Sequence, residues 1–155
     1  MRPCRVYRAL LLALIILGIV PAYAQTLTPT RTVTITANDE MKLNITEFTA
    51  KPGEVLRIRM LAVGTMPKAT MSHNLVILNT GTNQILFAEA AAKAVSTDYI
   101  PAAMKSSILA STILIGNGES AEIVFKVPSK PGNYPYLCSF PGHFAAGARG
   151  KIVVQ

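Results

Sequence analysis

The chain alternates apolar and polar positions in short segments that turn residues separate. Residues 32–37 and 42–46 carry an apolar side chain at every second position, and in residues 56–60 the apolar positions alternate with two arginines. This period of two is typical of strands that bury one face and expose the other. Further short, mainly apolar segments follow at residues 75–78, 112–115, 121–127, 134–138 and 151–154. The pattern predicts an all-β fold of about eight strands, a sandwich or barrel.

One stretch departs from this pattern. Residues 85–96 are rich in alanine, and Glu89 and Lys93 stand four positions apart in the order that supports a helix. We predict one short helix, inserted between strands, that caps the sandwich. No segment repeats at a fixed period and no low-complexity linker divides the chain, so we expect a single domain.

The first two dozen residues read as a targeting segment. Three arginines precede an apolar run over residues 9–20, and Ala22-Tyr23-Ala24 supplies the small residues that a signal peptidase requires. We predict a signal peptide over residues 1–24 and a domain over residues 25–155, periplasmic or secreted. The alternative is a retained anchor, but the run of 12 residues is shorter than the roughly 20 of a spanning helix. We therefore expect no membrane span in the mature protein.

Removal of this segment changes the cysteine count and the charge. Cys4 would be lost, which leaves Cys138 alone; a single thiol kept in an oxidising compartment indicates chemistry, unless it is simply a small buried hydrophobe. The formal net charge falls from +7 to +4, because 12 basic residues then face 8 acidic ones. No basic run interleaved with aromatic residues is present, so nucleic-acid binding has no support. We also expect the mature protein to be a monomer.

The two histidines stand in positions that suit a metal site. His143 follows the cysteine by five residues in Cys-Ser-Phe-Pro-Gly-His, where a tight Pro-Gly turn after a strand brings a thiolate and an imidazole toward one ion. His73 precedes the segment 75–78 and would converge on that ion from another strand. One cysteine with two histidines suits trigonal copper, because sulfur favours Cu(I) and the nitrogens accept Cu(II).

Two motifs resemble the azurins, which are bacterial members of the cupredoxin family. They are the Cys-Ser-Phe-Pro-Gly-His loop and the segment 66–74, Met-Pro-Lys-Ala-Thr-Met-Ser-His-Asn; a looser likeness runs from residue 35 to residue 154. The resemblance implies a Greek-key cupredoxin fold and one copper ion that alternates between Cu(I) and Cu(II). It makes His73, Cys138 and His143 the three equatorial ligands, and it implies a one-electron carrier that is not an enzyme and works with redox partner proteins.

The resemblance also assigns roles around the ligands. The Asn74 amide would tie the His73 strand to the cysteine loop near Ser139, although a plain turn residue is the alternative. Phe140 would pack inward, and His143 would be the ligand whose edge reaches solvent. An apolar patch for partner docking would surround it, formed by Pro141, Phe144, Ala145 and Ala146. A core position is the alternative for Phe144.

The chain departs from the family where an axial methionine is expected. Counting back from Gly150 places Ala148 there, and counting forward from His143 places Gly147; neither side chain has a donor atom. The backbone carbonyl of Ser72, which stands where azurins have glycine, is one candidate axial donor, and a methionine remote in sequence is another. The azurin disulfide is missing as well.

Two other functions remain open. Copper storage or delivery would suit a site with one open side. A catalytic zinc site also uses two histidines, a cysteine and an open position, and would need a general base such as Glu47, Glu89 or Glu119.

Overall fold

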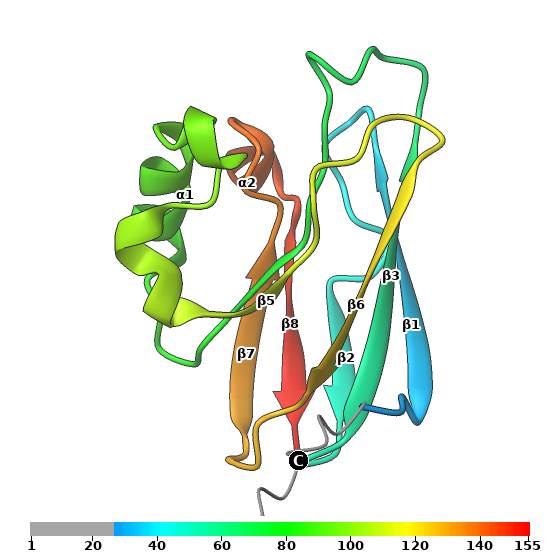
Figure 1. The fold of residues 1–155 in the computed structure, drawn as a ribbon, viewed down its shortest axis with the longest axis vertical. Coiled ribbons are helices and arrows are strands. Elements are labelled where there is room, and N and C mark those ends of the chain that lie inside the picture. Colours follow the sequence, from blue (N-terminus) through cyan, green and yellow to red (C-terminus); the bar gives the residue numbers. More distant parts are fainter. Residues whose placement is uncertain (1–26) are drawn as a thin grey trace, which may run out of the picture.

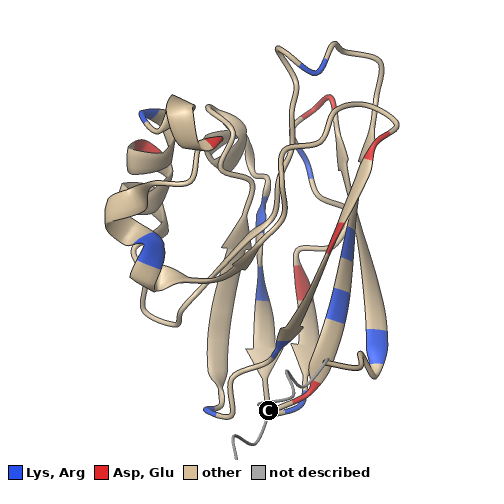
Figure 2. Ribbon diagram, in the orientation of Figure 1, with Lys and Arg blue, Asp and Glu red and all other residues tan. Residues whose placement is uncertain are grey.

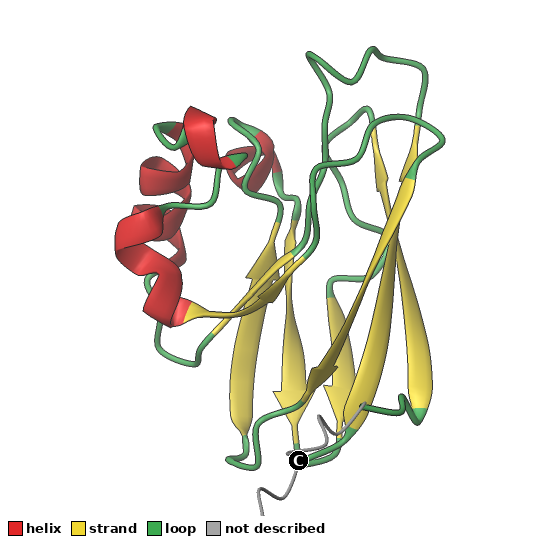
Figure 3. Cartoon of the chain, viewed as in Figure 1, coloured by secondary structure: helices red, strands yellow, loops and turns green. Residues whose placement is uncertain are grey.

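The structure is a computed structural model that describes residues 27–155; the predicted signal peptide and Cys4 lie outside the described residues. Eight strands form two facing sheets, and the helices gather on one flank (Figures 1 and 3). The smaller sheet has the order β1-β3-β6, with β1 parallel to β3 and β6 antiparallel to it. Its strands are β1 (Arg31–Asn38), β3 (Val55–Val63) and β6 (Ser120–Lys126).

The larger sheet has the order β2-β8-β7-β4-β5 and carries the candidate site. Strand β2 is parallel to β8, and the other neighbouring pairs are antiparallel. The strands are β2 (Glu47–Ala50), β4 (Val76–Leu78), β5 (Ile108–Ser111), β7 (Gly132–Leu137) and β8 (Arg149–Val154). The predicted all-β sandwich of about eight strands is therefore confirmed.

The alternation seen in the sequence builds the core between the sheets. Strand β3 buries Leu56, Ile58 and Met60, while Arg57 and Arg59 turn outward toward Glu122 on β6. Figure 2 shows that acidic and basic residues are interspersed along the strands. The charged side chains of the smaller sheet thus lie on its outer face, and they form no cluster of one sign.

The predicted helix is present but ends at Ala92, earlier than expected, and it packs on a face of the larger sheet rather than capping the sandwich. Helix α1 (Gln84–Ala92) begins after Asn83, whose side chain accepts hydrogen bonds from the amides of Ile85 and Leu86. It buries Phe87 and Ala91 in a second cluster with residues of β4 and β7. Two 3-10 helices, η1 (Val95–Thr97) and η2 (Ala102–Ser107), continue the flank, and a second α-helix, α2 (His143–Ala146), was not predicted.

Two strand predictions were misplaced. Residues 42–46 form no strand: Leu43 makes one isolated bridge with Ala37, and β2 begins only at Glu47. Two carbonyl oxygens of this segment bond to the larger sheet instead: that of Ile45 accepts from the Tyr136 hydroxyl (2.6 Å) and that of Thr46 accepts from the Lys151 amide (2.9 Å). Residues 112–115 likewise follow β5 rather than form it, and bridge only at Ile115, opposite His73.

Gly150 makes the Tyr136 contact possible. A Cβ atom at position 150 would lie 2.5 Å from both the Tyr136 hydroxyl and the Thr46 carbonyl oxygen. The Tyr136 ring therefore crosses β8 at Gly150, which has no side chain to block it. This crossing fixes residues 42–46 against the strands that lead into the candidate site.

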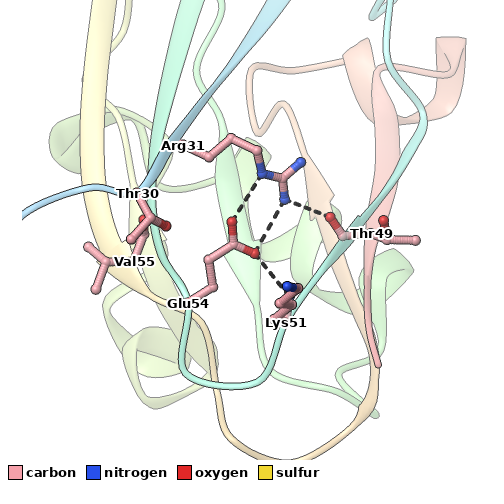
Figure 4. Close-up of polar contacts among 6 residues, drawn as sticks. All are labelled: Thr30, Arg31, Thr49, Lys51, Glu54 and Val55. Atoms are coloured by element: carbon pink, nitrogen blue, oxygen red, sulfur yellow. Dashed lines mark hydrogen bonds and ion pairs between the residues drawn. The ribbon is translucent and has the colours of Figure 1, made fainter.

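At the opposite end of the sandwich from α2, an ion pair joins three strand ends (Figure 4). Arg31 Nε donates to Glu54 at 3.0 Å, and Arg31 Nη2 donates to the Thr49 carbonyl at 2.7 Å. Glu54 also accepts from the Lys51 amide at 2.9 Å. The hydrogen bond from Arg31 is the main cause that lowers the pKa of Glu54, against an opposing effect of burial.

Glu54→Gln is expected to lower the free energy of unfolding by about 1 kcal/mol at neutral pH, because it removes the charged acceptor. A carboxyl whose pKa is lowered by folding stabilises above its unfolded pKa, and that stabilisation is lost as the pH falls through the folded pKa. The difference between wild type and variant should therefore shrink below about pH 4. Urea unfolding at pH 7 and pH 3.5 measures it, with exposed Glu40→Gln as control. An equal difference at both pH values would contradict the ion pair's role.

Candidate metal centre

Three side chains converge at the end of the sandwich that carries α2. His73 lies just before β4, Cys138 directly follows β7, and His143 is the first residue of α2. One donor atom from each residue lies within 4.8 Å of the others, and all three residues are buried. The imidazole rings of His73 and His143 are 4.7 Å apart between centroids. The structure thus brings together the three residues that the sequence analysis singled out.

The loop between Cys138 and His143 is a tight turn, as predicted. The His143 amide donates to the Phe140 carbonyl at 3.1 Å, with Pro141 and Gly142 at the two central positions of the turn. Gly142 has φ of 85°, a conformation that glycine adopts without steric cost. The turn places Cys138 Sγ 3.4 Å from His143 Nδ1. A single loop therefore presents two donors to the same point.

The third donor is held by a backbone bridge. The His73 amide donates to Ile115 and the Ile115 amide donates to His73, both at 2.8 Å. Within the described residues, His73 Nδ1 is a buried atom without a hydrogen-bond partner. A buried nitrogen left in this state costs free energy unless a partner binds it, so the site suits a metal ion.

Asn74 joins the two halves of the site, which confirms its predicted contact with Ser139. Its Oδ1 accepts from the Ser139 amide at 2.8 Å, and its Nδ2 donates to the Ser139 hydroxyl at 2.8 Å. The Asn74 amide points at Cys138 Sγ, 3.5 Å away. These buried hydrogen bonds hold the His73 strand and the cysteine loop at a fixed separation.

Burial shifts all three titratable groups toward their neutral forms. It raises the pKa of the Cys138 thiol to about 11, although the hydrogen bond from the Asn74 amide opposes this. Burial, together with the neighbouring His73, lowers the pKa of His143 to about 4, and burial lowers the pKa of His73 against the opposing charge of Asp39. Both imidazoles are therefore neutral at pH 7 and have lone pairs available for a cation.

Aromatic rings enclose the site more fully than the sequence suggested. Phe140 packs inward as predicted, with its ring centroid 4.9 Å from that of His143 and 5.1 Å from that of Tyr99. The prediction that an edge of His143 reaches solvent is wrong, since only 1% of the residue is exposed. Pro141 and Ala145 are exposed, while Phe144 and Ala146 are half-buried. Phe144 packs against the second cluster and under Arg149, whose guanidinium lies 4.7 Å above its ring.

Of the two candidate axial positions, only Ala148 belongs to the buried cluster that contains Cys138. Its carbonyl accepts from the Cys138 amide and its own amide donates to the His143 carbonyl, both at 2.9 Å. Gly147 faces Lys42 instead: a Cβ atom there would lie 3.0 Å from Lys42 Nζ. Ser72 is buried and donates its hydroxyl to the Lys68 carbonyl at 2.5 Å. Position 148 is therefore the one that lies against the cysteine.

Comparison with known proteins identifies the family. The sequence model of copper binding proteins of the plastocyanin/azurin family matches residues 30–155. The chain belongs to this family. It is 34% identical over 115 residues to Azurin-2 of Alcaligenes xylosoxydans xylosoxydans, covering 72% of this chain and 88% of the relative. It is 30% identical over 129 residues to Auracyanin-B of Chloroflexus aurantiacus, covering 82% and 53% respectively.

Solved cupredoxin structures agree with this assignment. The reduced auracyanin of Roseiflexus castenholzii superposes with a TM-score of 0.71 at 29% identity, covering 83% of this chain and 99% of that one. The recognition from the two motifs, the cupredoxin fold and the copper cofactor are thereby confirmed. A buried thiol with two neutral imidazoles is a donor set that fits copper.

Sequence reasoning missed three residues around this centre. Tyr99 covers Phe140, Arg149 stacks on Phe144, and the Lys42 ammonium contacts the Ala146 carbonyl. Arg149 is the first residue of β8 and stands six residues after His143, so the local sequence could have indicated it, but Tyr99 and Lys42 come from distant segments that carry no local signal. Within residues 27–155, no helix has the length and apolar character needed to cross a membrane.

Proposed function

We propose that this cupredoxin is an exported one-electron carrier that holds a single copper ion through His73, Cys138 and His143. The observation that carries the proposal is the convergence of these three buried donors within 4.8 Å. The similarity to azurins and auracyanins supports copper as the ion and electron transport as the task.

The surroundings of the site favour electron transfer. Copper bound there would alternate between Cu(I) and Cu(II) and so exchange one electron at a time. The chain's own part is to keep the donors still, which the Asn74 to Ser139 hydrogen bonds and the His73 to Ile115 bridge accomplish. Burial of all three donors excludes water, so that little has to rearrange when the charge changes.

The N-terminal segment supports export, and the similarity to azurins supports a redox partner protein. The proposal includes cleavage of residues 1–24, a mature monomeric domain over residues 25–155 in the periplasm or outside the cell, and no enzymatic activity. A redox partner protein would dock on the face next to His143, where Pro141, Gly142 and Ala145 are exposed. Because His143 itself is buried, the electron would pass through the atoms that cover it rather than through an exposed imidazole edge.

Copper storage or delivery is a second candidate that one observation favours. Neither Gly147 nor Ala148 offers a side-chain donor, which leaves fewer bonds to break when copper leaves. Zinc hydrolysis has weaker support, because Glu47 and Glu119 form surface ion pairs with Lys151 and Lys68, and Glu89 is exposed on α1.

The visible spectrum of the mature protein, residues 25–155, tests the proposal. Addition of Cu(II) should produce an intense thiolate-to-copper charge-transfer band, which zinc cannot give. A carrier should bleach and recover this band over repeated reduction and oxidation while an external chelator takes up little copper. A colourless copper complex would refute the site, and prompt transfer of copper to the chelator would favour delivery.

A further inference from the structure

The segment after His143 carries no side chain that can bind copper, yet it forms one wall of the site. Helix α2 ends at Ala146, Gly147 has φ of 111°, and Ala148 then turns back toward Cys138. In relatives with an axial methionine, the metal itself would bind this segment. In this chain, contacts with the rest of the protein have to hold it.

Lys42 supplies such a contact from far away in the sequence. Its ammonium donates to the carbonyl oxygen of Ala146, across 104 residues. A Cβ atom at Gly147 would lie 3.0 Å from Lys42 Nζ and 3.8 Å from Cδ, so the lysine side chain runs along this glycine. A cation at the C-terminal end of a helix also satisfies a carbonyl that the helix leaves unpaired.

Lys42 is itself anchored. Its amide donates to Asn38 Oδ1 at 3.0 Å, and its carbonyl accepts from the Asn38 amide at 3.2 Å. The residues that follow are fixed to the larger sheet through the Tyr136 hydroxyl and the Lys151 amide. The ammonium thus reaches Ala146 from a backbone with little freedom to move.

The contact lies directly behind the ligands. Ala148 is fully buried, its amide donates to the His143 carbonyl, and its carbonyl accepts from the Cys138 amide. Movement of residues 146–148 would therefore disturb both ends of the ligand loop. The hydrogen bond from Lys42 to the Ala146 carbonyl limits this movement on the side away from the ligands, and the backbone hydrogen bonds to Cys138 and His143 limit it on the side of the ligands.

We propose that Lys42 is a positioning residue of the copper site, whose bond to the Ala146 carbonyl holds residues 146–148 in the place where family members rely on an axial methionine. The inference rests on the proposed function, since it assigns Lys42 a role in retaining copper at His73, Cys138 and His143. It assigns no direct contact between Lys42 and the ion.

Lys42→Met tests this, because methionine keeps the length of the side chain and removes the donor and its charge. Loss of one hydrogen bond to a charged group should speed copper release to excess Cu(I) chelator by about fivefold or more and broaden the charge-transfer band. Lys42→Arg should restore both properties. Lys130→Met, an exposed change in the loop between β6 and β7, makes the same charge change elsewhere and should have no effect.

Hydrogen exchange of the copper-free protein supplies a readout that needs no metal. The Gly147 and Ala148 amides, which bond to the His143 carbonyl, should exchange about fivefold faster or more in Lys42→Met. Unchanged exchange and copper release overturn the inference, and so does faster release that Lys42→Arg fails to rescue. If the wild type binds no copper, the proposed function fails and the role of Lys42 falls with it; if it binds copper and Lys42→Met behaves identically, only the role of Lys42 fails.

Discussion

Cys138→Ser is expected to abolish the intense visible band of the copper-loaded protein while the sandwich stays folded. The band requires a thiolate bound to copper, and Cys138 is the one cysteine among the described residues. Removal of partners outside the ligand shell typically weakens metal binding by about 10- to 100-fold, so loss of the thiolate itself should cost more than about 100-fold. Spectra and a copper titration measure both effects.

The variant should fold because serine has nearly the shape of cysteine. The Asn74 amide and His143 Nδ1, which lie 3.5 Å and 3.4 Å from Sγ, can both contact the new hydroxyl. We expect the copper-free form to lose no more than about 2 kcal/mol of unfolding free energy. The neighbouring variant Ser139→Ala keeps all three donors and should retain the band. An intense band in Cys138→Ser would mean that its sulfur is not the donor.

Local sequence patterns were sufficient to predict two kinds of structure: a long strand whose apolar and polar residues alternate, and a turn whose hydrogen-bonded residues lie in one motif. Strand β3 could be predicted because apolar residues alternate with two arginines over residues 56–60, so the face that packs in the core is specified three times. The cysteine turn could be predicted because its closing hydrogen bond, from the His143 amide to the Phe140 carbonyl, spans only the loop itself. The alternation of side chains allowed the first prediction, and the residues that favour a tight turn allowed the second.

Predictions from the sequence were wrong where contacts between distant segments determine the structure. Residues 42–46 alternate like a strand, but the Tyr136 hydroxyl and the Lys151 amide donate to the Ile45 and Thr46 carbonyls, and no periodicity in the sequence reveals that competition. The burial of His143 could not be predicted either, because Phe140 covers the ring and is itself covered by Tyr99 from a loop more than 40 residues earlier. Helix α2, with four residues, is too short to show a helical period.

Ala148→Met is expected to lower the reduction potential of the copper by about 60 mV, which corresponds to a tenfold change in the relative affinity for Cu(I) and Cu(II). Ala148 is fully buried and its carbonyl accepts from the Cys138 amide, next to the Leu137–Arg149 pair of the β7–β8 ladder, so a longer side chain starting there would lie beside the ion. A thioether at this place adds a weak donor that stabilises Cu(II) relative to a site without one. Voltammetry of the two proteins measures the difference.

The sign of this shift depends on whether the wild-type site is dry. Water or an anion beside copper would be a hard oxygen ligand that favours Cu(II), and the wild-type potential would then lie below that of the variant. The buried cluster around Ala148 is apolar, and a single water there would lack the two to four polar partners it needs. We therefore expect the dry case, in which added azide leaves the wild-type spectrum unchanged.

Ala145→Met provides the matched control, because it adds the same side chain at an exposed position of α2, three residues earlier. Its potential should equal that of the wild type. Since position 148 lies in a packed core, Ala148→Met should also lose about 1 to 3 kcal/mol of unfolding free energy in the copper-free form, a cost that thioether binding to copper would offset in part. A wild-type potential below that of Ala148→Met, or a spectrum that responds to azide, would show that the site is wet; equal potentials in all three proteins would show that residue 148 does not face the metal.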